Sequence, residues 1–303
     1  MYRILSADKL SPTIYRMVVE APRVAKHCQP GQFIIVRKDE YGERVPFTIC
    51  DYDREAGTIT IVFQPVGAST TEISYLQAGD SFADFVGPLG NPSDLIYEDP
   101  EELKKKRIIF IAGGVGTAPV YPQVRWLHEH GVEADVIIGC KSKSFLIMED
   151  DFNKVCHLYV TTDDGSYGRS GMVTKCLEDL IEKEGKMYDH CVAIGPMVMM
   201  KFVVQMTKKY NIHTIVSMNP IMVDGTGMCG ACRLTVGGEV KFACVDGPEF
   251  DGFLVDFEQA MKRMAMYKTE EGRALLQSQE KETHHGGCGQ CSDGEKTTVG
   301  GAK

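Results

Sequence analysis

The sequence predicts an antiparallel β-barrel, followed by a doubly wound parallel α/β sheet and a small cysteine-rich lobe. Three observations lead to this fold class. Residues 1–98 consist of short β-rich runs separated by Pro and Gly pairs such as Pro30-Gly31. The following part alternates short apolar strands with helical segments, as a parallel sheet requires. Between residues 219 and 250 this alternation stops, and Gly and Cys become frequent.

Composition sets the broad class. The chain has 303 residues, enough for two domains, with 43% hydrophobic and 25% charged residues, as is ordinary for a soluble globular protein. Its net charge of −9 argues against nucleic acid as a partner, because phosphate binding needs a basic face. Met1–Leu10 lacks the apolar run of a signal peptide, and no stretch reaches the roughly 18–20 apolar residues that cross a bilayer. We therefore expect a cytoplasmic protein without membrane insertion.

In the barrel region, 1–98, one short helix is predicted from Ser69 to about Gln77. Ser69 or Thr70 would be its N-cap, and Glu72 is placed for a capping box with Ser69. The predicted strands are Tyr2–Ala7, Thr13–Glu20, Gln32–Arg37, Pro46–Tyr52 and Thr58–Pro65.

The α/β domain is expected over residues 99–218, after a polar linker at Asn91–Lys106. Its predicted strands are Arg107–Ala112, Ala134–Gly139, His157–Thr161, His190–Ile194 and Ile212–Ser217. Its predicted helices are about Thr117–His130, Phe145–Val155, Ser170–Glu184 and Pro196–Tyr210. Strands separated by helices in this way indicate parallel pairing.

The first strand of this domain runs into a glycine-rich turn, residues 113–119, and then into a helix. Glycines let the backbone approach a pyrophosphate, and the helix N-terminus offers unpaired N–H groups and a partial positive charge. Thr117 suits the N-cap position. The pattern is not a strict G-x-G-x-x-G, so an ordinary strand-to-helix turn remains the alternative for this motif alone.

Two further loops follow later strands, at 162–168 and 195–197. Ligands of open parallel sheets bind at the edge where the carboxyl ends of the strands meet, so three small-residue loops there predict a dinucleotide pocket. The expected NAD(P)-binding residues are Gly113, Gly114, Gly116, Thr117, Asp164, Gly165, Gly195, Pro196 and Met197.

The cysteines point to a metal centre. There are eleven, an odd number without a secretion signal, which argues against a disulfide framework. The most specific pattern is Asp224-x4-Cys229-x2-Cys232-x11-Cys244, close to the plant-type ferredoxin spacing for a 2Fe–2S cluster. Asp224 takes the place of the first cysteine and is interpreted as a carboxylate ligand. The alternatives are a lost ligand, a zinc site, or three structural cysteines.

The C-terminal part is expected to contain one helix within 251–271, at about 254–267, and then a flexible polar tail, 272–303. In that tail, Cys288 and Cys291 follow two histidines. This arrangement is equally compatible with an extra metal site and with a tail that binds nothing.

The order of barrel, dinucleotide domain and cysteine-rich lobe resembles the ferredoxin–NADP reductase superfamily over about residues 1–268. Within it, the chain is similar to the electron-transfer subunit of dihydroorotate dehydrogenase. It resembles even more the small (alpha) subunit of NADH-dependent ferredoxin:NADP oxidoreductase, also called the sulfide dehydrogenase beta chain. Asp224 favours the latter, because the dihydroorotate branch carries Cys at that position.

The resemblance implies FAD in the barrel. The segment 44–49 resembles the flavin motif R-P-x-[ST], with one residue inserted after Arg44; 62–64 matches the strand along the flavin, and 67–70 matches its pyrophosphate site. The FAD-binding residues implied are Arg44, Pro46, Phe47, Thr48, Val62, Phe63, Gln64, Gly67, Ser69 and Thr70.

The function implied is exchange of hydride between NAD(H) or NADP(H) and FAD, and of single electrons with the 2Fe–2S cluster. No catalytic residue is assigned, because direct hydride transfer needs no general acid or base. The implied partner is a larger flavo-iron–sulfur subunit, through which the pair would reach ferredoxin and bifurcate electrons. Lys141 and Lys143 could contact a 2′-phosphate or be surface lysines. The alternatives are the dihydroorotate dehydrogenase subunit, a redox-sensing protein without turnover, and a zinc-stabilised scaffold.

Overall fold

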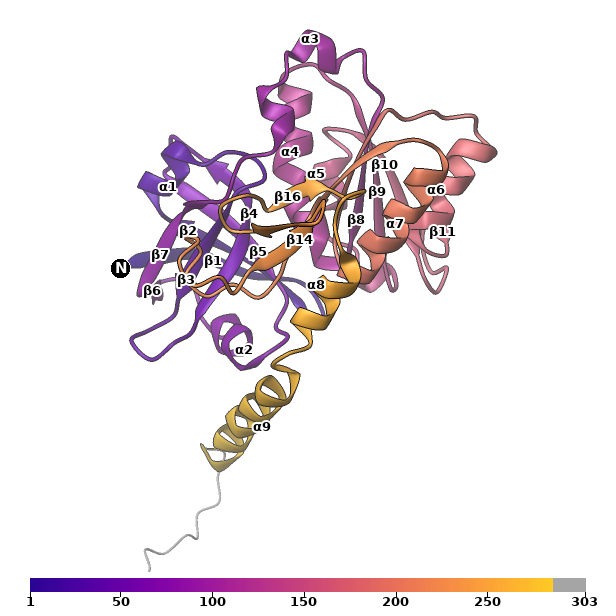
Figure 1. Cartoon of the computed structure of the whole chain (residues 1–303). Helices are drawn as coiled ribbons and strands as arrows, with labels where there is room; N and C mark the ends of the chain where they lie inside the picture. The colour runs from indigo at the N-terminus through magenta and orange to yellow at the C-terminus, as the bar shows by residue number, and fades with distance from the viewer. Residues whose placement is uncertain (286–303) are drawn as a thin grey trace, which may run out of the picture.

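The computed structural model describes residues 1–285. The N-terminal part is a seven-stranded antiparallel sheet, in the order β6-β1-β2-β5-β4-β3-β7, that curls into a nearly closed barrel (Figure 1). Alternate residues of the strands fill its interior with aliphatic and aromatic side chains. The strands are β1 (Tyr2–Ser11), β2 (Ile14–Glu20), β3 (Phe33–Arg37), β4 (Arg44–Asp53), β5 (Thr58–Phe63), β6 (Ser81–Phe82) and β7 (Asp84–Leu89). The helices are α1 (Pro22–His27) and α2 (Ala68–Ser74).

A second seven-stranded sheet, in the order β11-β10-β9-β8-β12-β13-β16, forms the α/β part beside the barrel (Figure 1). It is parallel except for β16, which pairs antiparallel with β13. Its strands are β8 (Ile108–Gly113), β9 (Ala134–Cys140), β10 (His157–Thr162), β11 (Arg169–Ser170), β12 (His190–Ile194), β13 (His213–Ser217) and β16 (Glu249–Asp251). Its α-helices are α3 (Pro100–Leu103), α4 (Thr117–Glu129), α5 (Glu149–Phe152), α6 (Val173–Glu182) and α7 (Met197–Lys209).

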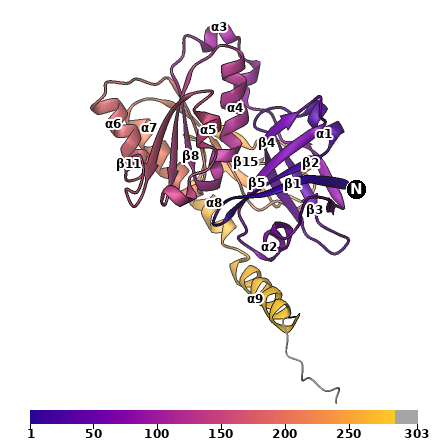
Figure 2. The same cartoon turned by 180° about the vertical axis from the view of Figure 1, so that it is seen from behind.

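The two faces of this sheet are covered by different helices because successive strand residues point to opposite sides. Ile108 and Phe110 pack with α4, whereas Ile109 and Ile111 pack with α6 and α7. Helix α4 also contacts strand β4 of the barrel, so it lies between the two sheets (Figure 2). The carboxyl ends of β8, β9, β10 and β12 are left uncovered at one edge.

The cysteine-rich segment lies between barrel and α/β sheet (Figure 1). It contains the hairpin β14 (Arg233–Val236) and β15 (Glu239–Phe242), followed by α8 (Phe257–Met264) and α9 (Lys268–His285). Helix α9 projects away from the body of the protein in both views (Figures 1 and 2). The predicted flexible tail is therefore wrong for 272–285. Many strong helix formers, among them Glu, Ala, Leu and Gln, explain a solvated helix there.

Two other predicted elements differ from the structure. The helix expected over Phe145–Val155 is reduced to a 3-10 turn, Lys143–Phe145, and the single turn α5. The capping box of Ser69 and Glu72 does not form. Ser69 donates to Glu43, Glu72 pairs with Lys38, and the helix begins after Gly67. Strands β6 and β7 and helix α1 had no counterpart among the predicted elements.

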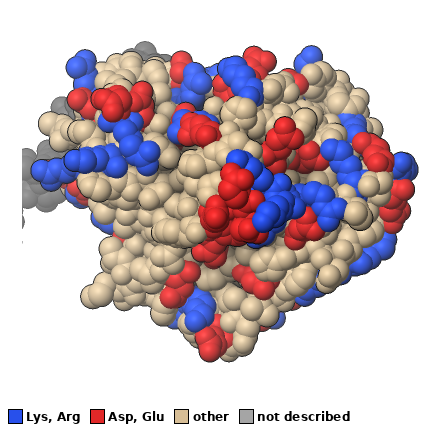
Figure 3. Space-filling view, turned by 90° about the horizontal axis from the view of Figure 1, so that it is seen from above, with Lys and Arg blue, Asp and Glu red and all other residues tan. Residues whose placement is uncertain are grey.

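No helix in residues 1–285 is long and apolar enough to cross a membrane. On the face seen in Figure 3, acidic and basic side chains are intermixed. Around α3 they form ion pairs: Lys104 with Glu101, Lys105 with Glu102, and Lys106 with Glu98.

Candidate functional site

The glycine-rich turn connects β8 to α4 at the uncovered edge of the parallel sheet. Gly116 stands at the N-cap of α4, one residue before the predicted Thr117. A Cβ atom at Gly116 would lie 2.5 Å from the carbonyl oxygen of Ile194 and 2.7 Å from Cα of Gly195, so only glycine fits. The turn is thereby pressed against the loop that follows β12.

Thr117, the first residue of α4, is enclosed inside the turn. The residue is fully buried, and its hydroxyl has no hydrogen-bond partner in the described part of the chain. A buried hydroxyl without a partner costs free energy, roughly 1–3 kcal/mol. Its own amide donates to the carbonyl oxygens of Gly114 and Val115, so Thr117 belongs to the packed interior of the turn and is shielded from solvent.

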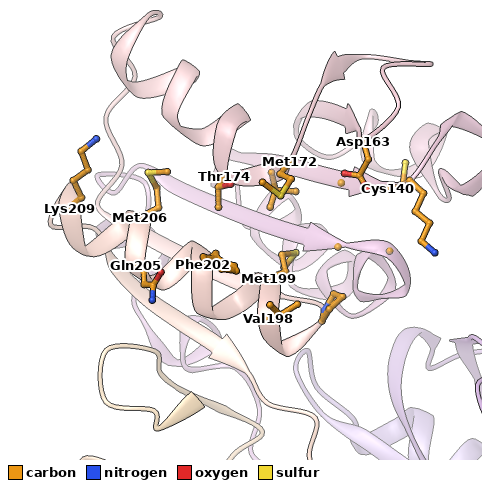
Figure 4. Close-up of a pocket in the computed structure, with 16 residues that line it drawn as sticks. Cys140, Asp163, Met172, Thr174, Val198, Met199, Phe202, Gln205, Met206 and Lys209 are labelled. Carbon is orange, nitrogen blue, oxygen red and sulfur yellow. The ribbon is translucent and has the colours of Figure 1, made fainter. Parts of the chain in front are cut away.

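A cavity of about 680 Å³ opens next to this turn. Figure 4 shows α7 forming one wall with Val198, Met199 and Phe202, while Met172 and Thr174, at the start of α6, lie opposite. The floor is made by the ends of β8 and β9. A largely apolar cleft of this volume with a few polar groups is typical of a cofactor site.

The structure brings only part of the predicted NAD(P)-binding set to this cavity. Gly113, Gly114 and Pro196 line it. Asp164 does not: hydrogen bonds from Ser166, first from its hydroxyl and then from its amide at 2.9 Å, lower the pKa of Asp164. Its neighbour Asp163 lines the cavity instead. Met197 is buried in the core behind it. Gly116, Thr117, Gly165 and Gly195 belong to the surrounding turns but are not in the lining.

Several lining residues were missed by the sequence analysis. Phe202, Gln205, Met206 and Lys209 recur on one face of α7 at helical spacing. Its apolar members, Phe202 and Met206, resemble core positions, so only the position of α7 beside the sheet edge reveals this face as a cavity wall. Of the two lysines considered for a 2′-phosphate, Lys141 lines the cavity, whereas Lys143 lies over the ring of Tyr167 at 4.5 Å.

The residues of the flavin motif lie on β4 and β5, which are neighbours in the barrel. Phe47 and Phe63 point into the barrel core, with ring centroids 5.0 Å apart. Pro46, Thr48 and Gln64 are partly exposed. Because successive side chains of a strand point to opposite faces, Pro46 and Thr48 form the outer face next to Phe47.

The segment 66–70 follows directly after β5. Thr70 accepts hydrogen bonds from the amides of Val66 at 2.9 Å and Gly67 at 3.1 Å, which fixes the start of α2. Val66 is 76% exposed beside this polar turn. An outer strand face of small and polar groups with an uncovered apolar side chain fits a bound flavin nucleotide.

The flavin strands and the dinucleotide turn contact one another through a small apolar cluster. Cys50 and Val62 on the barrel pack with Val115 and Ala118 of the turn and with Ile147. The two predicted cofactor sites therefore lie on either side of one interface, as transfer between two stacked cofactors requires.

The cysteines of the lobe form a pair and a separate ligand position. Cys232 and Cys244 are buried, with their sulfur atoms 3.3 Å apart, whereas Cys229 is exposed. Burial and the neighbouring Cys232 raise the pKa of Cys244 to about 12, so a metal must displace its proton on binding.

In residues 1–279, whose side chains the structure describes, no three His, Cys, Asp or Glu side chains converge on one point. In a 2Fe–2S cluster, four protein ligands serve two irons. The Cys232–Cys244 pair then fits one iron, and Asp224 with Cys229 fits the other.

Asp224 organises the loop that carries these ligands. Its carboxylate accepts bonds from the amides of Thr226 at 2.8 Å, Cys229 at 3.0 Å and Met228 at 3.1 Å. These bonds, that of Thr226 first, lower the pKa of Asp224, so the group is ionised. An ionised carboxylate next to Cys229 fits a metal ligand, although the carboxylate also holds the loop by itself.

The loop is attached to the barrel at the flavin motif. Arg44, at the start of β4, donates to the carbonyl oxygens of Val223 at 3.1 Å and of Asp224 at 3.2 Å. Gly225 has a φ of +78°, and a Cβ there would lie 2.5 Å from Ile35 of β3. The predicted flavin residue Arg44 thus holds the cluster loop in this structure.

Comparisons with known proteins agree with an iron–sulfur cluster in this lobe. Residues 219–256 match the family model "Iron-sulfur cluster binding domain of dihydroorotate dehydrogenase B". An electron-transfer subunit homolog of dihydroorotate dehydrogenase B from Thermotoga maritima is 41% identical over 88% of this chain and 92% of its own. The corresponding subunit of Streptococcus mutans is 33% identical over 82% of this chain and 94% of its own.

The chain belongs to the family of dihydroorotate dehydrogenase B electron-transfer subunits and their homologues. A Clostridium beijerinckii protein, "Uncharacterized protein in adh 3'region", is 62% identical over 95% of this chain and 98% of its own. A structure of NADH-dependent reduced ferredoxin–NADP oxidoreductase superposes with a TM-score of 0.84 at 40% identity, covering 91% of this chain and 97% of that one. An Amycolatopsis cytochrome P450 reductase shares the fold alone, with a TM-score of 0.58 at 19% identity, covering 70% and 68%.

The predicted fold class is confirmed by these comparisons, as is the expected electron-transfer family. One predicted site falls outside the described residues: Cys288 and Cys291 lie within 286–303.

Proposed function

We propose that this chain is the NAD(H)-linked electron-transfer subunit of a heteromeric oxidoreductase. It exchanges hydride between a nicotinamide dinucleotide at the 113–117 turn and FAD on the outer face of β4 and β5. Single electrons then pass to a 2Fe–2S cluster held by Asp224, Cys229, Cys232 and Cys244, and onward to a larger flavo-iron–sulfur partner.

One observation carries this proposal: the dinucleotide turn and the cluster loop are both attached to the strands of the flavin motif. The turn packs on Cys50 and Val62. The loop is held by Arg44 and packs on Ile35. A barrel surface touched by both sites fits an electron path with a flavin in the middle.

FAD supplies the ability to exchange two electrons with a nicotinamide and one with a cluster. The residues of this chain bind the two cofactors and orient them. Gly113, Gly114 and Gly116 let the backbone approach the phosphates at the start of α4. Val198, Met199 and Phe202 would exclude water around the bound dinucleotide, and Pro46 and Thr48 would hold the flavin. No residue is required to move a proton.

The partner is inferred from the relatives of this chain. A similar protein, at 40% identity, is the NADH-dependent reduced ferredoxin–NADP oxidoreductase, studied for flavin-based electron bifurcation. We infer the same type of complex here, with ferredoxin reached through the larger subunit. The aspartate at position 224 supports this branch.

The second candidate is a dihydroorotate dehydrogenase complex, favoured by the names of several relatives at 28–41% identity. Co-purification from the native host separates the two. A partner with a pyrimidine substrate selects the second candidate, and a partner that reduces NADP and ferredoxin selects the first.

Anaerobic titration of the purified chain with NADH and NADPH tests the proposed function. We expect flavin absorbance to bleach and the EPR signal of a reduced 2Fe–2S cluster to appear on the same sample. A flavin that stays oxidised would indicate a redox-sensing protein without turnover. Colourless protein with zinc and no iron would contradict the proposal.

A further inference from the structure

Arg263, near the end of α8, lies against the cluster loop. Its guanidinium Nη2 donates to the carbonyl oxygen of Ala231 at 3.1 Å. Ala231 stands between the ligands Cys229 and Cys232, and its own amide points at the Cys229 sulfur, 3.5 Å away. Arg263 therefore holds the residue that offers an N–H group to a cluster thiolate.

Helix α8 is fixed relative to the lobe, so the contact between Arg263 and Ala231 is held in place by the surrounding structure. Asp256 caps the helix by accepting a bond of 3.0 Å from the Gln259 amide. The Gln259 side chain accepts a bond of 2.7 Å from Thr235 on β14. Since β14 begins directly after Cys232, helix and ligand loop form one unit.

Among residues 1–279, whose side chains the structure describes, Arg263 forms no ion pair, whereas Lys201 pairs with Glu258 on the same helix. Its Nε is buried without a hydrogen-bond partner, beside a cavity of about 50 Å³ lined by Pro220, Tyr267 and their neighbours. A half-buried, unpaired positive charge is weakly screened by water and salt.

Reduction adds one electron, and hence one negative charge, to an iron–sulfur cluster. Nearby positive charge and N–H groups directed at the sulfurs stabilise the reduced state and raise its reduction potential. A guanidinium stays protonated throughout, so it gives up no proton in this step.

We propose that Arg263 is a positioning residue that raises the reduction potential of the 2Fe–2S cluster, by holding Ala231 in place and by its unpaired charge. The proposal rests on the cluster assignment made above. It adds a determinant of how readily electrons leave the flavin for the cluster, and it places that determinant outside the ligand set.

The test is an EPR-monitored redox titration of the full chain with Arg263→Gln. We expect the cluster midpoint to fall by about 59 mV, equivalent to a tenfold change in a one-electron equilibrium. Lys262→Gln is the matched control, because Lys262 carries the same charge one residue away and is exposed. We expect it to change that equilibrium less than twofold. Arg263→Lys, which keeps the charge, should fall between wild type and Arg263→Gln.

Equal shifts in Arg263→Gln and Lys262→Gln would overturn the proposal, as would an unshifted midpoint in Arg263→Gln with its EPR signal intact. If Arg263→Gln holds no cluster, Arg263→Lys decides: a lowered midpoint supports the proposal and a wild-type midpoint overturns it. Wild-type protein without iron would contradict both this inference and the proposed function. A cluster that NADH reduces, but whose midpoint potential is the same in wild type and in the Arg263 variants, would contradict this inference alone.

Discussion

The dinucleotide turn, 113–117, and the cluster loop, 224–232, are both glycine-rich segments that present backbone N–H groups, but they are held in different ways. The turn joins a buried strand to a helix, so regular structure on both sides sets its shape. The loop has no strand or helix of its own. It depends on the Asp224 carboxylate and on two arginines, Arg44 and Arg263.

This difference predicts which substitutions should disturb each segment. The turn is limited by steric fit, because Gly116 lies against the backbone of Ile194 and Gly195. The loop is limited by a few side chain to backbone bonds, each of which can be removed without touching a thiolate. Substitutions should therefore damage the turn through packing and the loop through loss of its polar anchors.

Asp224→Ala tests the polar anchoring of the loop and should have the largest effect. It leaves the amides of Thr226, Met228 and Cys229 without their acceptor and removes the proposed fourth ligand of the cluster. We expect nearly complete loss of iron with flavin content retained, measured by metal analysis and absorbance. Asp224→Cys restores the ferredoxin pattern and should retain iron. Full iron content in Asp224→Ala would show that Asp224 is neither ligand nor anchor.

Gly116→Ala tests the steric limit of the turn. The new methyl group meets backbone atoms that cannot move aside, so we expect a loss of about 3 kcal/mol in the free energy of unfolding, at the upper end for overpacking. NADH binding should be lost as well. Gly238→Ala is the control, with a φ of +83° but open space around it, and should cost only ~1–2 kcal/mol. Equal losses in urea unfolding would remove the steric argument.

Glu249 connects the two regions, because it follows the cluster loop and accepts a bond of 2.6 Å from Gln123 on α4. Burial raises the pKa of Glu249 from 4.5 to about 7. Between these values the folded protein holds a proton that the unfolded chain has released, so stability falls as pH rises from 4.5 to 7. Glu249→Gln should remove this fall and stabilise the protein at pH 8 by roughly 1–3 kcal/mol. Parallel curves of stability against pH for wild type and Glu249→Gln would contradict a raised pKa of Glu249.

Thr117→Val is a substitution in the turn that should raise the free energy of unfolding, and its expected effect is the smallest of the series. Removing a buried hydroxyl that has no partner should stabilise the unliganded chain by about 1 kcal/mol. Because the hydroxyl is shielded from the cavity, NADH binding should be unchanged, as measured by titration calorimetry alongside thermal unfolding. A destabilised variant would show that the hydroxyl has a partner in the fold.

Much of the fold was predictable because it follows local patterns. Apolar runs of the right length gave β9, β10, β12 and β13 nearly to the residue. The two-residue strand β6 and the Gly- and Pro-containing β7 were missed, since neither carries an alternating pattern of useful length. Helix α9 was missed because polar composition was taken for flexibility, although helix propensity alone favoured a solvated helix.

The candidate site was predictable where spacing encodes it and not where the tertiary fold does. The spacing of Cys229, Cys232 and Cys244 identified the cluster segment, and the glycine-rich turn identified the sheet edge. The roles of Arg44 and Arg263 depend on contacts with residues 179 and 32 positions away, respectively, which no local pattern reports. The α7 wall of the cavity was hidden because its apolar stripe looks like core.

Freeze-quench EPR after rapid mixing with NADH tests the central claim, that electrons leave a flavin on β4 and β5 singly for the Cys232–Cys244 lobe. In the wild type, flavin bleaching should be followed by a reduced-cluster signal. In Cys232→Ser, the flavin should bleach at an unchanged rate with no cluster signal. A reduced-cluster signal that precedes flavin reduction, or flavin reduction that fails in Cys232→Ser, would contradict the account.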